Sequence, residues 1–165
     1  MDHLFTPWRY TYVTTAGDEP GCVLCKIAEG DPVEDERLLV LHRGHRNFVV
    51  LNAFPYTCGH LMVVPYRHVP RLSGLEPAER DELIALATRA EAILEETYRA
   101  EGLNLGMNLG RCAGAGIAEH LHLHALPRWI GDTSFMTATG ETRVLPETPQ
   151  QSWTRLRGRF SEVKG

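Results

Sequence analysis

The chain lacks the features that tie proteins to membranes or to nucleic-acid polymers. Its 165 residues carry 17 Lys and Arg against 21 Asp and Glu, a formal net charge of −4. This balance argues against a duplex-DNA binder, which is normally basic. No apolar run approaches the roughly 18 residues of a membrane span, and residues 1–21 contain no apolar signal core. We therefore expect a cytoplasmic protein without a membrane or nucleic-acid partner.

Cysteine is also scarce. The four cysteines are Cys22, Cys25, Cys58 and Cys112. Only the first two are close in sequence, so nothing indicates a secreted disulfide framework. This CxxC pair is compatible with half of a zinc site, with unmetallated thiols or with a redox pair. A redox pair would expect a thioredoxin-like βαβ setting, which the sequence does not indicate. Zinc would need two further ligands, for which spare histidines exist at His60, His68 and His120.

Histidine, by contrast, is concentrated in one place. Three of the eight histidines alternate with apolar residues, at His120, His122 and His124. In a β-strand this alternation places three imidazoles on one face and apolar side chains on the other. Because imidazole exchanges protons near pH 7, such a row can supply a nucleophile, a proton donor and an orienting or metal-binding group. The alternative is an exposed strand whose polar face is merely rich in histidine.

The remaining pattern predicts an α+β fold. Apolar residues recur at helical spacing from Pro77 to Ala100, which indicates one long helix. Strand patterns occupy residues 37–42, 47–52, 60–65, 103–109 and 120–126. Strands joined by turns around one inserted helix favour a mainly antiparallel sheet of about five strands, packed against that helix. We expect one domain, residues 1–165, with an N-terminal arm (1–21), a core (22–127) and a C-terminal extension (128–165).

The segment between Asn108 and Gly116 is rich in small residues and lies directly before the histidines. Small residues let backbone N–H groups approach an anion, although a hairpin loop has the same composition. Beside the histidine row, the segment favours a phosphate site. Asn52 ends an apolar strand pattern, where its side chain can bond a sugar hydroxyl or cap the following turn.

Together these residues resemble the histidine-triad family of nucleotide-binding hydrolases and transferases. The matching residues are the His-φ-His-φ-His run, the CxxC, Asn108-x-Gly110, and Asn52-x-x-Pro55-x-x-x-Gly59-His60-Leu61-Met62-Val63-Val64-Pro65-x-x-His68. They cover about residues 20–127. The flanks, including Pro127-Arg128-Trp129-x-Gly131-Asp132-Thr133, resemble the branch that contains bacterial diadenosine tetraphosphate phosphorylases. The resemblance implies a histidine-triad fold with a C-terminal extension.

The resemblance also implies a mechanism. His122 would attack the α-phosphorus of a nucleoside polyphosphate and form a covalent nucleotidyl-histidine, while His124 bonds a phosphate oxygen or the leaving group. Asn108 would help to hold the phosphate charge, and Asn52 would bond the ribose. Backbone N–H groups of the loop would share that task, at Gly110, Gly114, Ala115 and Gly116.

The implied reaction is phosphorolysis of diadenosine tetraphosphate to ADP and ATP, with inorganic phosphate as the second substrate. Hydrolysis of dinucleoside polyphosphates or adenylated conjugates is the alternative enzyme reaction, and a non-catalytic nucleotide-binding protein is the alternative of another class. The family's hydrolases often have glutamine and then serine or threonine where this chain has Gly116 and Ile117. This departure favours phosphate over water as the acceptor.

The resemblance also implies a structural zinc ion, no organic cofactor, and a homodimer. The zinc ligands would be Cys22, Cys25, His68 and His120. Arg128 and Arg143 are candidates to neutralise distal phosphates, with solvated surface charge as the alternative. Arg155, Arg157 and Arg159 are expected on a solvated helix face.

Overall fold

The computed structural model describes residues 21–132 and 145–162. The expected N-terminal arm therefore lies outside the described residues, apart from Gly21, and so does Arg143. Within the described part, no helix has the length and apolar character to cross a membrane.

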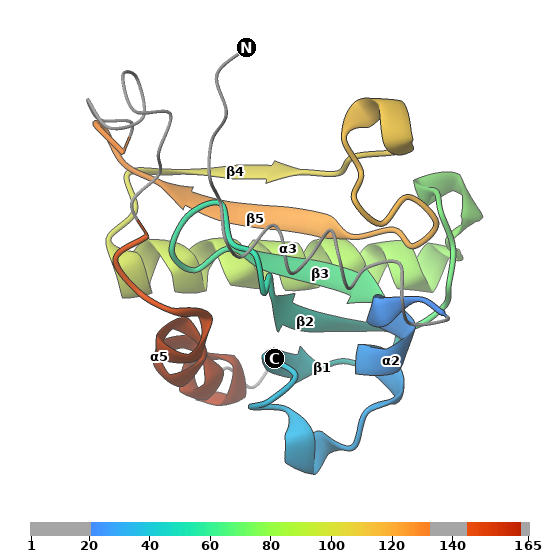
Figure 1. Ribbon diagram of the computed structural model, residues 1–165, viewed down its shortest axis with the longest axis horizontal. Coiled ribbons are helices and arrows are strands. Elements are labelled where there is room, and N and C mark those ends of the chain that lie inside the picture. The colour runs from blue at the N-terminus through green and yellow to red at the C-terminus, as the bar shows by residue number, and fades with distance from the viewer. Residues whose placement is uncertain (1–20, 133–144, 163–165) are drawn as a thin grey trace.

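A five-stranded sheet forms the centre of the molecule (Figure 1). Its strands are β1 (Val40–Arg43), β2 (Asn47–Leu51), β3 (Leu61–Pro65), β4 (Gly102–Gly106) and β5 (Leu123–Arg128). Their order is β1-β2-β3-β5-β4, and every neighbouring pair is antiparallel. Every residue of β2 and β3 is buried, as expected for central strands covered on both faces. The predicted α+β architecture is confirmed.

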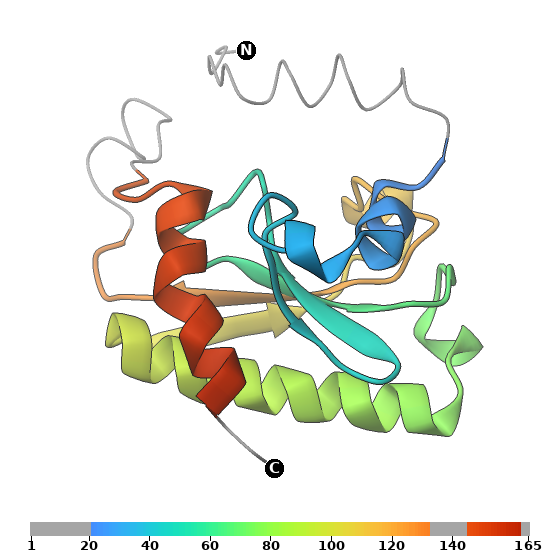
Figure 2. The same cartoon turned by 90° about the horizontal axis from the view of Figure 1, so that it is seen from below.

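The long helix α3 (Pro77–Tyr98) covers one face of this sheet, and Figure 2 shows it as a separate layer. Its buried apolar side chains follow the predicted helical spacing: Leu83, Leu86, Ala87, Ala90, Ile93 and Leu94. At its first turn, the Glu79 carboxylate accepts a hydrogen bond from the backbone N–H of Glu76 at 2.7 Å. Arg67 binds the same carboxylate and lowers the pKa of Glu79 to about 2.

A second helix, α5 (Pro149–Glu162), covers the outer edge of β1. Thr148 and Gln151 exchange hydrogen bonds at its start, which satisfies backbone donors of the first turn. Leu156 and Phe160 are completely buried in the main core. The Trp153 indole donates to the Val40 carbonyl at 2.9 Å. These contacts cover apolar surface and occupy part of a strand edge that would otherwise be open.

The arginines of α5 meet the expected solvated state only in part. Arg155 is exposed, where it pairs with Glu147 at 3.2 Å. Arg157 and Arg159 are half-buried: Arg157 donates to the Leu41 carbonyl at 3.1 Å, and Arg159 pairs with Glu96. These two differ from the expectation because α5 packs against β1 and α3.

Two elements near the histidines also differ from the sequence expectation. A short helix, α2 (Val23–Glu29), begins directly after Cys22. β5 begins at Leu123 rather than at His120. The residues before it leave the sheet because the Leu121 N–H donates to the Val69 carbonyl at 2.7 Å, in the loop that follows β3.

Candidate active site and metal centre

Three buried histidines form one cluster beside the start of β5. His124 lies in β5, His122 directly precedes that strand, and His60 directly precedes β3, which pairs with β5. Their side chains are 1–8% exposed. The rings of His60 and His124 are 5.1 Å apart, and those of His122 and His124 are 4.8 Å apart, measured between centroids. His120 is equally buried, but its Nδ1 faces the CxxC instead.

The hydrogen bonds of His60 determine which atoms carry protons. The Tyr56 backbone N–H donates to His60 Nδ1 at 3.1 Å, so this nitrogen is an acceptor. The proton of a neutral His60 therefore lies on Nε2, which is 2.9 Å from His124 Nδ1. His124 Nδ1 must then accept, which leaves the proton of neutral His124 on Nε2. His124 thus presents an N–H donor.

His122 has the opposite arrangement. Its Nδ1 lies 2.8 Å from the backbone carbonyl oxygen of His120. A carbonyl oxygen accepts hydrogen bonds only, so the proton of neutral His122 lies on Nδ1. The Nε2 atom keeps its lone pair and can act as a nucleophile. Neighbouring side chains therefore offer a lone pair at His122 and a hydrogen-bond donor at His124.

Burial keeps His60 and His124 neutral. Loss of solvation lowers the pKa of His60 to about 3, and the neighbouring rings of His124 and His122 act in the same direction. Burial also lowers the pKa of His124 to about 4, with His122 as a further cause. The neutral tautomers described above are therefore the dominant forms of His60 and His124 near pH 7.

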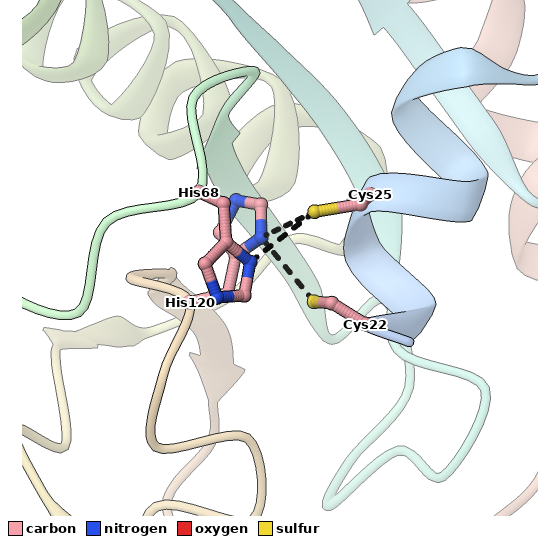
Figure 3. A group of neighbouring side chains, drawn as sticks. All are labelled: Cys22, Cys25, His68 and His120. Carbon is pink, nitrogen blue, oxygen red and sulfur yellow. Dashed lines mark hydrogen bonds between the residues drawn. The ribbon is translucent and has the colours of Figure 1, made fainter. Parts of the chain in front are cut away.

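A second cluster brings together Cys22, Cys25, His68 and His120 (Figure 3). Cys25 Sγ lies 3.2 Å from His68 Nδ1 and 3.5 Å from His120 Nδ1. Cys22 Sγ lies 3.4 Å from His120 Nδ1. All four ligand atoms lie within 4.8 Å of one another. The two sulfur atoms come from the start of α2, while the histidines come from the loops that precede η2 (Leu72–Gly74) and β5.

This donor set fits a tetrahedral metal ion. Zinc–sulfur bonds of about 2.3 Å and zinc–nitrogen bonds of about 2.0 Å place tetrahedral ligand atoms roughly 3.5 Å apart. His120 Nε2 lies 2.9 Å from the Pro65 carbonyl oxygen, a contact that orients the ring with Nδ1 toward the cysteines. Without a cation, burial and the neighbouring Cys22 raise the pKa of Cys25 to about 11. His60, one of the spare histidines in the sequence, belongs to the other cluster.

The two clusters are joined through one residue. The His120 ring faces the cysteines, while its backbone carbonyl accepts the His122 Nδ1–H. Any displacement of His120 therefore also displaces the partner that sets the tautomer of His122. The three alternating histidines therefore do not form one face of equivalent side chains. His120 belongs to the cysteine cluster, and His122 and His124 belong to the histidine cluster.

The glycine-rich loop surrounds a short helical turn, η3 (Arg111–Ala113). Gly110 and Gly114 have φ of +97° and +88°, which glycine adopts without strain. The N–H groups of Gly114 and Ala115 donate to carbonyls within the loop, at 3.0 and 3.3 Å. These two groups are therefore already engaged. Within the described residues, the N–H of Gly116 has no such acceptor and stays a phosphate-binding candidate.

The other predicted site residues fall into different environments. Asn52 Oδ1 accepts the Phe54 N–H at 2.9 Å, so the capping role exists in the structure. The half-buried Asn108 side chain has no hydrogen-bond partner among the residues described. Arg128 lies toward the far end of β5, where it binds Asp132 at 2.9 Å and Asn104 at 2.7 Å. The structure thus does not bring Arg128 to the histidine cluster.

Sequence reasoning missed the role of His60. It was considered only as a spare metal ligand and as part of a motif, yet its bond to His124 sets that ring's tautomer. The Tyr56 ring lies 4.7 Å from the His60 ring. Pairing between β3 and β5 creates this contact across 64 positions of sequence. Only the motif Gly59-His60 marked the position in advance.

Comparison with known proteins places this geometry in a family. The model of the HIT domain matches residues 35–129. The chain belongs to the HIT family. A protein named AP-4-A phosphorylase, from Mycobacterium tuberculosis, is 40% identical over 152 residues, which cover 89% of this chain and 78% of the relative. An asymmetrical bis(5′-nucleosyl)-tetraphosphatase from Schizosaccharomyces pombe is 33% identical but covers 58% of the chain and 52% of that protein.

Solved structures agree. A crystal structure of a zinc-bound histidine-triad family protein from Mycobacterium smegmatis superposes with a TM-score of 0.69 at 28% identity. The match covers 86% of this chain and 94% of that one. The HIT fold anticipated from the sequence is thereby confirmed.

Proposed function

We propose that this HIT protein is a nucleotidyltransferase that cleaves diadenosine tetraphosphate with inorganic phosphate, yielding ADP and ATP. The observation that carries the proposal is the pair of opposed tautomers. His122 keeps a lone pair on Nε2 because its Nδ1 donates to a carbonyl, while His124 keeps a proton on Nε2 because its Nδ1 accepts from His60. A protein that only binds nucleotides needs no such nucleophile.

The reaction proceeds in two steps. His122 Nε2 attacks the α-phosphorus; an N–P bond forms, the bond to the bridging oxygen breaks, and ATP leaves. His124 Nε2–H donates to a phosphate oxygen as negative charge shifts toward the leaving group. The attached imidazole becomes cationic, and its Nδ1–H bond to the His120 carbonyl stabilises that charge. Inorganic phosphate then attacks the same phosphorus, ADP is released and His122 is regenerated.

The loop before the histidines supports phosphate rather than water as the acceptor. Gly116 is exposed and has no side chain, while Ile117 is half-buried and packs against the core. Neither residue offers a side-chain group that can hold an attacking water by a hydrogen bond. The relative that matches over most of this chain carries the name AP-4-A phosphorylase. Asn108, whose side-chain amide has no partner within residues 21–132 and 145–162, and the Gly116 N–H are our candidates for holding the phosphate oxygens.

We also propose that Cys22, Cys25, His68 and His120 hold a structural zinc ion. All four positions are filled by protein ligands, which is typical of a structural site and leaves no open position for substrate. The zinc-bound relative of known structure supports the same assignment. Zinc would join α2 to the two loops that carry its histidine ligands.

The open edge of the sheet favours the expected homodimer. β4 is the last strand, and Asn104, Leu105 and Gly106 are exposed along it. A second copy pairing at this edge would satisfy its backbone groups and cover Leu105.

The proposal is tested by incubating the protein with diadenosine tetraphosphate, with and without phosphate, and identifying the nucleotides formed. ADP and ATP that appear only with phosphate support phosphorolysis. AMP and ATP in plain buffer would mean hydrolysis, and no turnover would exclude both reactions for this substrate. His122→Ala is expected to abolish nucleotidyl transfer; near-normal activity in that variant would exclude His122 as the nucleophile.

A further inference from the structure

An open groove lined in part by arginine and leucine side chains lies at the end of the molecule that carries the glycine-rich loop. One part has a volume of about 480 Å³ and is lined by Arg71, Leu72, Ser73, Arg80 and Leu109. The adjoining part, of about 190 Å³, is lined by Pro70, Arg71, Gly110, Arg111, Ala118 and Glu119. Arg71 lines both parts. The turn at 72–74 and the loop at 110–119 lie at the same end of the sheet in Figure 1.

The charges of the groove favour an anion. Three guanidinium groups line it against one carboxylate, that of Glu119. Arg71 and Arg111 are exposed, and the structure gives neither of them an ion-pair partner among residues 21–132 and 145–162. Arg80 donates to the Leu75 carbonyl. Elsewhere arginines such as Arg37, Arg43 and Arg67 do form ion pairs with carboxylates.

The groove lies beside the chain segment that leads to His122, since Ala118 and Glu119 line it. The Leu121 N–H donates to the Val69 carbonyl at 2.7 Å, so the segment that carries Arg71 runs directly beside the segment that carries His122. Arg71 is two residues beyond Val69, and His122 is one residue beyond Leu121. Three residue steps at about 3.8 Å each, together with roughly 5 Å between the two segments at the Leu121–Val69 bond, span at most roughly 16 Å of backbone. An extended arginine side chain and a polyphosphate chain together can cover such a gap.

We propose that this groove binds the leaving nucleotide, the half of the dinucleoside polyphosphate that departs as ATP. The inference rests on the proposed function, because it assigns the second half of that substrate. Arg71 and Arg111 bind the distal phosphates through charge-assisted hydrogen bonds. Leu72 and Leu109 contact the second nucleobase, beside the guanidinium groups of Arg71 and Arg80, which can stack on an aromatic ring.

The test compares equilibrium binding of AMP, ATP and diadenosine tetraphosphate by calorimetry. All proteins carry His122→Asn, so that no ligand is turned over. Arg71→Gln and Arg111→Gln are each expected to weaken ATP and diadenosine tetraphosphate binding about tenfold, with AMP binding unchanged. Leu109→Ala is expected to weaken ATP and diadenosine tetraphosphate binding, because both place a nucleobase in the groove, and to leave AMP binding unchanged. Arg37→Gln, an exposed arginine paired with Glu34, is the matched control and should change none of the three affinities.

The inference is overturned if the arginine variants bind ATP as tightly as the parent, or if their AMP and ATP affinities fall equally. The parallel assay of the unsubstituted protein with diadenosine tetraphosphate and phosphate reports on the proposed function separately. If that assay shows no turnover while Arg71→Gln and Arg111→Gln still weaken ATP binding as expected, the proposed reaction is rejected but the groove remains a polyphosphate-binding site.

Discussion

At the residue scale, proton positions in the site follow from a few fixed hydrogen-bond partners. A backbone N–H sets the tautomer of His60, and a backbone carbonyl sets that of His122. The tautomer of His60 in turn determines that of His124 through the hydrogen bond between them. The sequence could predict that these histidines act together, because their spacing and the family motif are visible in it. It could not predict their tautomers, because these depend on backbone groups brought near by the fold.

Replacing His60 with Ala tests its positioning role. Without the Nε2–H donor of His60, His124 can adopt the other tautomer, and its ring can rotate away from the position in the structure. We expect kcat for phosphorolysis to fall about 10²-fold, as for a misplaced catalytic group, with KM changed little. Steady-state kinetics measure kcat and KM separately. The His60→Gln variant, whose side-chain amide can still donate a hydrogen bond, should recover part of kcat. A rise in KM at constant kcat in both variants would contradict the role.

The same burial predicts how stability depends on pH. His60 and His124 have folded pKa values of about 3 and about 4, below the usual value of 6.5. At a pH between the folded pKa and 6.5, each of these histidines binds more protons in the unfolded chain than in the folded one. The unfolding free energy therefore falls as pH drops from about 6.5 toward 4. Each histidine contributes a slope of up to about 1.4 kcal/mol per pH unit.

Urea denaturation at pH 7, 6 and 5 measures this slope. The His60→Gln variant should show a shallower slope than the parent, because one titrating group is gone. A parent protein whose stability is constant between pH 7 and 5 would show that these histidines are not held neutral by folding.

At the element scale, segments with a strong apolar pattern were predicted well, whereas α2 and the start of β5 were not. The α3 helix follows from apolar residues at helical spacing, and β2 and β3 follow from nearly continuous apolar runs, because both faces of these strands are buried. The α2 helix is only 7 residues long and buries just Leu24, so little periodicity marks it. β5 begins late because tertiary contacts of His120 and Leu121 override the alternating pattern.

Zinc at the cluster of Cys22, Cys25, His68 and His120 would join α2 to the loop before β5, and a variant that loses the ion tests that link. We expect Cys25→Ser to lose most of its bound zinc, measured by elemental analysis of protein purified without chelators. Its melting temperature should fall, and so should kcat, because His120 holds His122. Cys112→Ser, which changes an exposed cysteine outside the cluster, should keep its zinc. A zinc-free parent protein would exclude the metal assignment.

At the scale of the whole molecule, the two edges of the sheet differ. The β1 edge is covered by α5, where Trp153 and Arg157 occupy strand carbonyls. The β4 edge is exposed at Asn104 and at Leu105, which is 46% exposed. The described part of the chain therefore blocks association at the β1 edge and leaves the β4 edge exposed.

If dimerisation uses β4, Leu105→Lys should shift the protein to a monomer, because a charge would be buried at the shared edge. Sedimentation velocity measures the mass in solution. Ile84→Lys, a change of another exposed apolar residue, on α3, tells whether the helix also takes part. A Leu105→Lys protein that stays dimeric, or a parent protein that is monomeric, would contradict this arrangement.

The central claim is that AMP is carried covalently on His122 Nε2 between cleavage and phosphate attack. The most direct measurement is mass spectrometry of the protein after mixing with diadenosine tetraphosphate in phosphate-free buffer and quenching in base, since phosphorus–nitrogen bonds to histidine are labile in acid. The account predicts one AMP on the peptide that contains His122, discharged as ADP when phosphate is added. Turnover with phosphate but no adduct, or an adduct on another residue, would contradict it.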